Sequence, residues 1–318
     1  MTPIGATLFG IGRLKSNFRD RLCRAKTDGR KAAHRADGLR CGTRETQFIL
    51  LNAWNDETRQ RYFSENRYEI FLKEHDEVTE FFTTKTFKSD FPEREATLRS
   101  RFFQRLALRK LLAAYTAGEE MPSLAFLFED LVDKYQIRQA KLAKSEQSPD
   151  ISPLSIDDWP HEYEECVQVI GFCALLHRAD LLKRFVRLID NAGYVGDDTL
   201  YEDLLCKILP NRHDVDQWYH DVYSPLVQAI YIEDKEKASN LLQQYCEQWY
   251  SAFEQAPWYD THLQGEDGNY DGYWAIETGA IAFLYGIDDS KIDHMVYPKD
   301  LVEYARSFTA STTPLSDI

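Results

Sequence analysis

An adjacent histidine and aspartate, His213-Asp214, are residue types that can do hydrolytic chemistry. In an all-helical protein such a pair can hold a divalent metal ion for phosphoester hydrolysis, with His177 and His220 as further ligands. The structural alternative is that Asp214 caps a helix carrying Trp218. A metal site also needs ligands that converge from other helices, and few are evident. We therefore expect no metal and no cofactor, and we keep a metal-dependent phosphohydrolase as an alternative function.

Carboxylates and aromatic rings gather in a second stretch, residues 260–273, which contains no Lys or Arg. Their spacing does not match a calcium-binding EF-hand, in which acids alternate along the loop and a Glu ends it. The stretch is either a solvated connection or an interface, where carboxylates attract a cationic partner and rings anchor it. Residues 197–203 are a further acidic stretch. The candidate partner-binding residues are Asp260, Glu266, Asp267, Tyr270, Asp271, Tyr273, Asp197, Asp198, Glu202 and Asp203.

Signatures of common enzyme classes are missing from the sequence. It contains neither a G-x-x-x-x-G-K-[ST] phosphate-binding loop nor a G-x-S-x-G nucleophile turn. The six cysteines form no C-x-x-C pair and no dense disulfide framework, which favours a reducing cytoplasm. No run of about 18 apolar residues predicts a membrane span. We therefore predict a cytoplasmic protein that is not an enzyme.

Helices must position these groups, because apolar residues recur at helical spacing through most of the chain. Amphipathic helices are predicted over residues 56–84, 90–118 and 121–142, and no stretch alternates as a strand does. We expect an all-α protein of about ten helices, packed as antiparallel helical hairpins in two contiguous halves. The predicted parts are a basic arm (1–48), an N-terminal helical region (49–145), a linker (146–160), a C-terminal helical region (161–308) and a tail (309–318).

Charge is distributed unevenly along the chain. The 318 residues include 38 Lys and Arg and 52 Asp and Glu, for a net charge of -14. Residues 1–44 hold 11 basic and three acidic residues, a net of +8, which leaves -22 for residues 45–318. This acidity argues against a nucleic-acid or membrane binder, and it would speed capture of a cationic protein or simply maintain solubility. The basic arm is expected to be disordered or to reflect a wrongly assigned start of the chain.

The segment 260–304 joins the acidic loop to a helix that is apolar on most of its surface and must be covered by other helices. Gly286 closes that helix, and Pro298 can occupy the first turn of the next one. Two sequences in this part of the chain, YDGYWAIETGAIAFLYGIDD and YPKDLVEYAR, resemble the C-terminal part of the PoNi-type immunity proteins. The stretch RFFQRLALRKLLAAYTAGEEM resembles the N-terminal half of the same family, and the likeness spans roughly residues 52–306.

The resemblance implies a protein that binds and neutralises a cognate antibacterial toxin, a PoNe-type DNase, and so protects the cell that produces the toxin. It implies no direct contact with nucleic acid or membrane, and it leaves open whether the protein is a monomer or a homodimer. A helical scaffold for another protein partner remains a further alternative.

Overall fold

The computed structural model of this chain describes residues 58–85, 90–266 and 268–311. Residues from Asn52 onward form one compact unit, and the structural statements below concern the described residues of that unit. The predicted arm (1–48), Asp267 and residues 312–318 of the predicted tail lie outside the described residues.

Helices dominate the described part of the chain, which contains ten α-helices and no β-strand. The predicted all-α class is therefore confirmed. Within the described residues, no helix combines the length and apolar character needed to cross a membrane. The helices are α3 (Glu65–Thr84), α4 (Pro92–Ala117), α5 (Met121–Glu146), α6 (Pro160–Leu175), α7 (Ala179–Ile189), α8 (Thr199–Cys206), α9 (Ser224–Tyr231), α10 (Lys235–Ala252), α11 (Ile276–Tyr285) and α12 (Lys299–Ser311).

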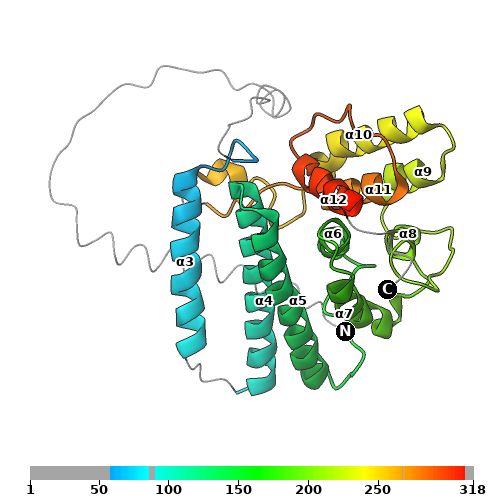
Figure 1. Cartoon of the computed structure of the whole chain (residues 1–318). Helices are drawn as coiled ribbons and strands as arrows, with labels where there is room; N and C mark the ends of the chain where they lie inside the picture. The colour runs from blue at the N-terminus through cyan, green and yellow to red at the C-terminus, as the bar shows by residue number, and fades with distance from the viewer. Residues whose placement is uncertain (1–57, 86–89, 267, 312–318) are drawn as a thin grey trace, which may run out of the picture. The chain divides into compact units, whose positions relative to one another are not determined.

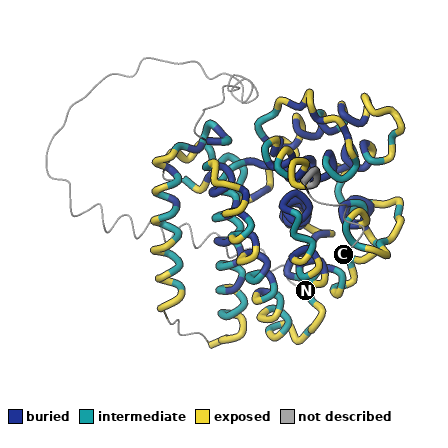
Figure 2. The backbone as a smooth tube through the Cα atoms, in the orientation of Figure 1, coloured by how far each residue is buried: buried dark blue, intermediate teal, exposed yellow. Residues whose placement is uncertain are grey.

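The three long helices α3, α4 and α5 lie side by side (Figure 1), with α4 packed against both of its neighbours. Gly118 ends α4 in the left-handed conformation, at a φ of 95°, which a residue without a side chain adopts most easily. Only Arg67 and Phe71 of α3 are buried, and Figure 2 shows most of this helix as exposed or intermediate. One face of α3 is therefore open to solvent.

Helix α3 begins nine residues later than the sequence pattern predicts. Ser64 is its N-cap, with Oγ accepting a hydrogen bond from the backbone N–H of Arg67 at 3.1 Å. The preceding residues follow an irregular path because their side chains bond elsewhere: Thr58 donates to the Phe63 carbonyl at 2.8 Å, and Gln60 reaches the C-terminal part of the chain. Helical spacing of apolar residues cannot reveal such contacts.

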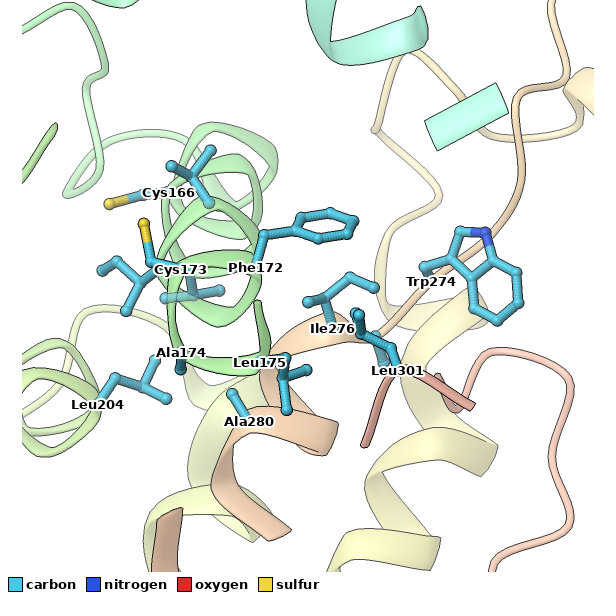
Figure 3. Packing of buried hydrophobic residues seen from close by; sticks show 14 of the residues in the cluster. Cys166, Phe172, Cys173, Ala174, Leu175, Leu204, Trp274, Ile276, Ala280 and Leu301 are labelled. Carbon is cyan, nitrogen blue, oxygen red and sulfur yellow. The ribbon is translucent and has the colours of Figure 1, made fainter. Parts of the chain in front are cut away.

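Helices α6 and α11 form the centre of the core. Every residue of α6 from Glu162 to Leu175 is buried. The two helices approach closely at Gly171, where a Cβ atom would lie 2.9 Å from Ile276 Cγ2 and 3.2 Å from its carbonyl oxygen. Figure 3 shows Ile276 beside this part of α6, near the labelled Phe172 and Leu175. A small residue is thus needed on α6 at this crossing.

The segment between α5 and α6, residues 147–159, lies in the predicted linker. It enters the core through Leu154 and Ile156, which are buried. The next residues, Asp157 and Trp159, are exposed, and Trp159 keeps 53% of its surface in solvent. This segment therefore anchors itself in the core and then presents polar and aromatic groups at the start of α6.

Candidate partner-binding site

The predicted acidic loop is tied to the N-terminal helices by its own carboxylates. Arg109 of α4 donates from Nε and Nη2 to the two oxygens of Asp271, at 2.5 and 3.0 Å. Ser64 donates to Glu266 at 2.9 Å. Both predicted site residues thus have partners within the chain, and Glu266 is the one that remains exposed.

The aromatic residues of this loop face inward. Tyr270 and Tyr273 are almost fully buried, and Gln60 links them, because its side-chain oxygen accepts from the Tyr270 hydroxyl and from the Tyr273 backbone N–H. Burial raises the pKa of both tyrosines. Asp260, half-buried, accepts a hydrogen bond from the Tyr250 hydroxyl at 2.7 Å. The rings that were expected to anchor a partner instead hold the loop against the rest of the fold.

In the second acidic stretch, Asp198 and Glu202 are each only 1% exposed and organise the loop that follows α8, residues 207–220. Asp198 accepts from the backbone N–H of Tyr219 at 2.9 Å. Glu202 accepts from Nε and Nη2 of Arg212 at 2.7 and 2.8 Å. Burial would raise the pKa of Glu202, but Arg212 and two backbone N–H groups together hold it below its ordinary value. These two carboxylates are internal supports of the loop.

Asp203 is half-buried between two tyrosines. The Tyr231 hydroxyl donates to its carboxylate at 3.1 Å, and the Tyr285 hydroxyl donates to its backbone oxygen at 3.0 Å. Burial raises the pKa of Asp203 to about 6, and the carboxylate of Asp214 adds to the effect. Asp203 therefore becomes charged at a higher pH than an exposed aspartate does.

Asp197 is exposed and lies beside two half-buried tyrosines. The rings of Tyr194 and Tyr219 meet edge to face with centroids 6.3 Å apart, and Asp197 is next to the Tyr219 side chain. The Tyr194 hydroxyl donates to Asp157 at 2.7 Å. Burial, reinforced by the carboxylates of Asp157 and Asp158, raises the pKa of Tyr194. Three separate segments of the chain converge here.

We call this surface the Tyr194/Tyr219 face. It consists of Asp157, Tyr194, Asp197 and Tyr219, which lie together, and of their exposed neighbours in the chain, Asp158, Trp159 and Val195. Only Asp197 was a predicted site residue. Asp157, Asp158 and Trp159 were missed because they lie in the predicted linker and were treated as connecting chain. Two acids followed by a large aromatic residue, in a stretch without Lys or Arg, were the available signal.

The proposed metal ligands do not converge. The Nε2 atom of His177 bonds with a carbonyl oxygen of α12 at 2.9 Å, and that of His220 bonds with the Ile156 carbonyl at 2.8 Å. His213 and Asp214 are exposed. Within the described residues, no three or more His, Cys, Asp and Glu side chains are grouped so that they could hold a metal ion. The ligand set that the phosphohydrolase hypothesis needs is therefore not assembled in this part of the chain.

The structural alternative for Asp214 was also wrong. No helix carrying Trp218 forms, and residues 212–220 are irregular. Backbone groups of this segment bond to α8 instead, as when the Thr199 backbone N–H donates to the Gln217 carbonyl at 2.8 Å. Hydrogen bonds to α8 therefore replace the backbone hydrogen bonds that a local helix would form.

Two carboxyl groups lie in the core where α6 meets α11. Glu164 accepts hydrogen bonds from Gln168 at 2.6 Å and from the Trp258 indole at 2.9 Å, and Glu277 accepts from the Tyr245 hydroxyl at 2.6 Å. Burial raises the pKa of both glutamates, that of Glu277 to about 7, and the Glu277 charge adds to the shift of Glu164. Because both side chains are buried, they act on stability and are not exposed to a partner.

Residues 196–301 match the family model that describes the C-terminal region of PoNe immunity proteins (PoNi). The predicted resemblance to the C-terminal part of this family is confirmed, whereas the predicted resemblance of the N-terminal stretch lies outside the matched residues. The PoNi match begins immediately before Asp197 and covers α8 to α11, including the loop supported by Asp198 and Glu202. It ends at Leu301, in the first turn of α12.

The fold is similar to the crystal structure of protein PA2201 from Pseudomonas aeruginosa, with a TM-score of 0.58 at 18% sequence identity. The similarity covers 83% of this chain and 95% of that one. At this identity the likeness concerns the fold alone. No curated protein is matched.

Proposed function

We propose that this chain is an immunity protein that binds a cognate antibacterial toxin and neutralises it. The match of residues 196–301 to the PoNi family model is the observation that carries the proposal. The partner is then a PoNe-type nuclease domain, most simply a DNase. The chain acts in the cytoplasm of the producing cell, as a stoichiometric inhibitor and not as an enzyme, and it contacts the toxin without touching DNA or membrane.

Electrostatics supports this pairing. A nuclease must present cationic side chains to the phosphates of its substrate, and the same field attracts an acidic protein. Residues 45–318 carry a net charge of -22, the chain total of -14 less the +8 of residues 1–44. Complementary charge raises the association rate and disfavours partners of like charge. An inhibitor can thereby compete with nucleic acid for a newly arriving toxin.

The test is to co-express this chain with the toxin domain encoded beside its gene, isolate the complex and measure DNA cleavage by that domain. The expected result is a stable complex and complete loss of cleavage near one equivalent of this chain. An unrelated nuclease in the same buffer controls for removal of metal or DNA by the acidic protein. If no complex forms and cleavage persists at excess protein, the proposed pairing is wrong.

A further inference from the structure

We propose that the Tyr194/Tyr219 face is the surface on which the toxin docks, and that it binds the cation-rich, phosphate-contacting surface of the nuclease. This inference rests on the proposed function and assigns the contact to one place on the fold. The argument combines three properties of the face: unpaired charge, exposed aromatic surface and rigid support.

Unpaired carboxylates distinguish this face from the predicted acidic loop. Asp157, Asp158 and Asp197 are exposed, and none of them forms an ion pair with another described residue. By contrast, Asp271 is neutralised by Arg109. An unpaired exposed carboxylate can bond to an incoming Arg or Lys without first breaking an internal ion pair.

Aromatic and apolar surface accompanies these charges. Trp159 is 53% exposed and Val195 is 40% exposed. Tyr194 and Tyr219 are half-buried and pack against each other, so their rings are already oriented. Tryptophan and tyrosine dominate the residues that contribute most to protein interfaces, and their faces also attract guanidinium and ammonium groups. Rings beside carboxylates therefore suit an arginine-rich or lysine-rich protein surface.

Buried polar groups hold the face in place. Asp198 caps α8 and also accepts from the Tyr163 hydroxyl of α6 at 2.5 Å. Arg212 bridges Glu202 and Asp190, at 2.7 and 2.6 Å, beneath the turn that carries Tyr194. A surface that is already ordered loses less conformational entropy on binding, so more of its contact energy is retained as affinity.

The competing surface is the open face of α3. It is acidic too, through the exposed Glu69, Glu77 and Glu80. However, α3 packs chiefly against one neighbouring helix and has only two buried residues, whereas the Tyr194/Tyr219 face rests on the central helix α6 and on α8. Glu69, Glu77 and Glu80 supply the same number of exposed carboxylates as Asp157, Asp158 and Asp197, so α3 provides a control of equal charge.

The experiment compares two triple variants that change net charge equally. One carries Asp157→Lys, Asp158→Lys and Asp197→Lys, and the other carries Glu69→Lys, Glu77→Lys and Glu80→Lys. The probe is the purified toxin domain from the co-expression above, with affinity measured at fixed salt and inhibition of DNA cleavage measured in parallel. We expect the face variant to lose about 100-fold or more in affinity and the α3 variant less than about 10-fold.

A neutral pair of substitutions separates aromatic contact from charge. Trp159→Ala should weaken binding about tenfold, because an exposed anchor is lost. The matched control is Leu263→Ala, which removes another exposed large side chain, 66% in solvent, without affecting the face. Circular dichroism and melting temperature establish that each variant is folded. If the lysine variant does not fold, the milder Asp157→Asn, Asp158→Asn, Asp197→Asn variant replaces it and should still weaken binding more than its α3 glutamine equivalent.

The outcomes separate this inference from the proposed function. If the wild-type chain inhibits the toxin but both triple variants bind as it does, the docking surface lies elsewhere and the proposed function stands. Equal losses in both variants would mean that net charge alone governs binding, which also overturns the inference. If the wild-type chain neither binds nor inhibits, the proposed function fails, and the docking inference fails with it.

Discussion

Replacing Glu277 by glutamine should stabilise this protein above neutral pH. Glu277 is fully buried, and the Tyr245 hydroxyl donates to its carboxyl group at 2.6 Å. Its second oxygen has no hydrogen-bond partner among the described residues. An ionised carboxylate in such a place has lost its water without adequate compensation, which is why burial raises the pKa of Glu277 to about 7.

The size of the effect follows from the difference between the folded and unfolded states. The folded protein holds this proton up to about pH 7, whereas an ordinary glutamate releases it near 4.5. The stabilising contribution of the protonated group is therefore complete below 4.5 and is lost as the pH rises through 7. That difference corresponds to about 3 kcal/mol of unfolding free energy at pH 8. Glutamine is neutral throughout and avoids this loss.

The assay is urea unfolding of the wild-type protein and the Glu277→Gln variant at pH 5, 6, 7 and 8. Intrinsic fluorescence should report the unfolding transition, because the rings of Trp249 and Trp258 are stacked in the folded protein with their centroids 4.7 Å apart. The stability difference should be within about 1 kcal/mol at pH 5 and should favour the variant by about 3 kcal/mol at pH 8. The control is Glu69→Gln, which neutralises an exposed carboxylate on α3. A difference for Glu277→Gln that does not change with pH would refute the reasoning.

Three further outcomes follow from packing, ion pairing and thiol exposure. Arg212→Ala should reduce the unfolding free energy by about 3 kcal/mol, because it leaves the buried Glu202 without its cation, and hydrogen exchange should speed up in the loop after α8. Gly171→Ala should cost about 1–3 kcal/mol in denaturant unfolding, because the new Cβ would meet Ile276 at 2.9 Å. In a variant with Cys23 and Cys41 replaced by serine, Cys206 should be the first thiol to be alkylated in the native protein. The other three cysteines are buried, and burial raises the pKa of their thiols.

Local rules were sufficient for most of the helices. The apolar helix expected within residues 260–304 forms as α11, and Gly286 ends it at a φ of 63°, as a left-handed cap requires. Glycine, proline and apolar spacing act within a few residues of where they stand, so one sequence reveals them. The start of α3 was predicted too early. The side chains of Thr58 and Gln60 form hydrogen bonds that draw the preceding residues out of a helix, and the spacing of apolar residues does not reveal such bonds.

The site was harder to predict because the environment of a carboxylate depends on residues distant in sequence. Asp271 and Arg109 are 162 positions apart, and nothing local indicates that they pair. Asp198 and Glu202 looked like surface acids but support the irregular segment that replaces the helix expected around Trp218. Residue type therefore located acidic stretches, whereas only the fold shows which carboxylates remain unpaired.

The difference between total negative charge and unpaired, exposed carboxylates matters for how an acidic inhibitor works. Under the proposed function, all ionised carboxylates contribute to the long-range field that draws a cationic toxin toward the chain, although a paired group such as Asp271 is cancelled by its neighbour. In the proposed docking, close contact depends instead on the few carboxylates that are exposed and beside aromatic rings, as Asp157 and Asp197 are. Salt screens the field and so mainly lowers the association rate, whereas loss of a close contact mainly raises the dissociation rate. Net charge and docking surface are thus separate properties of this fold, and kinetic measurements on the two triple variants can distinguish them.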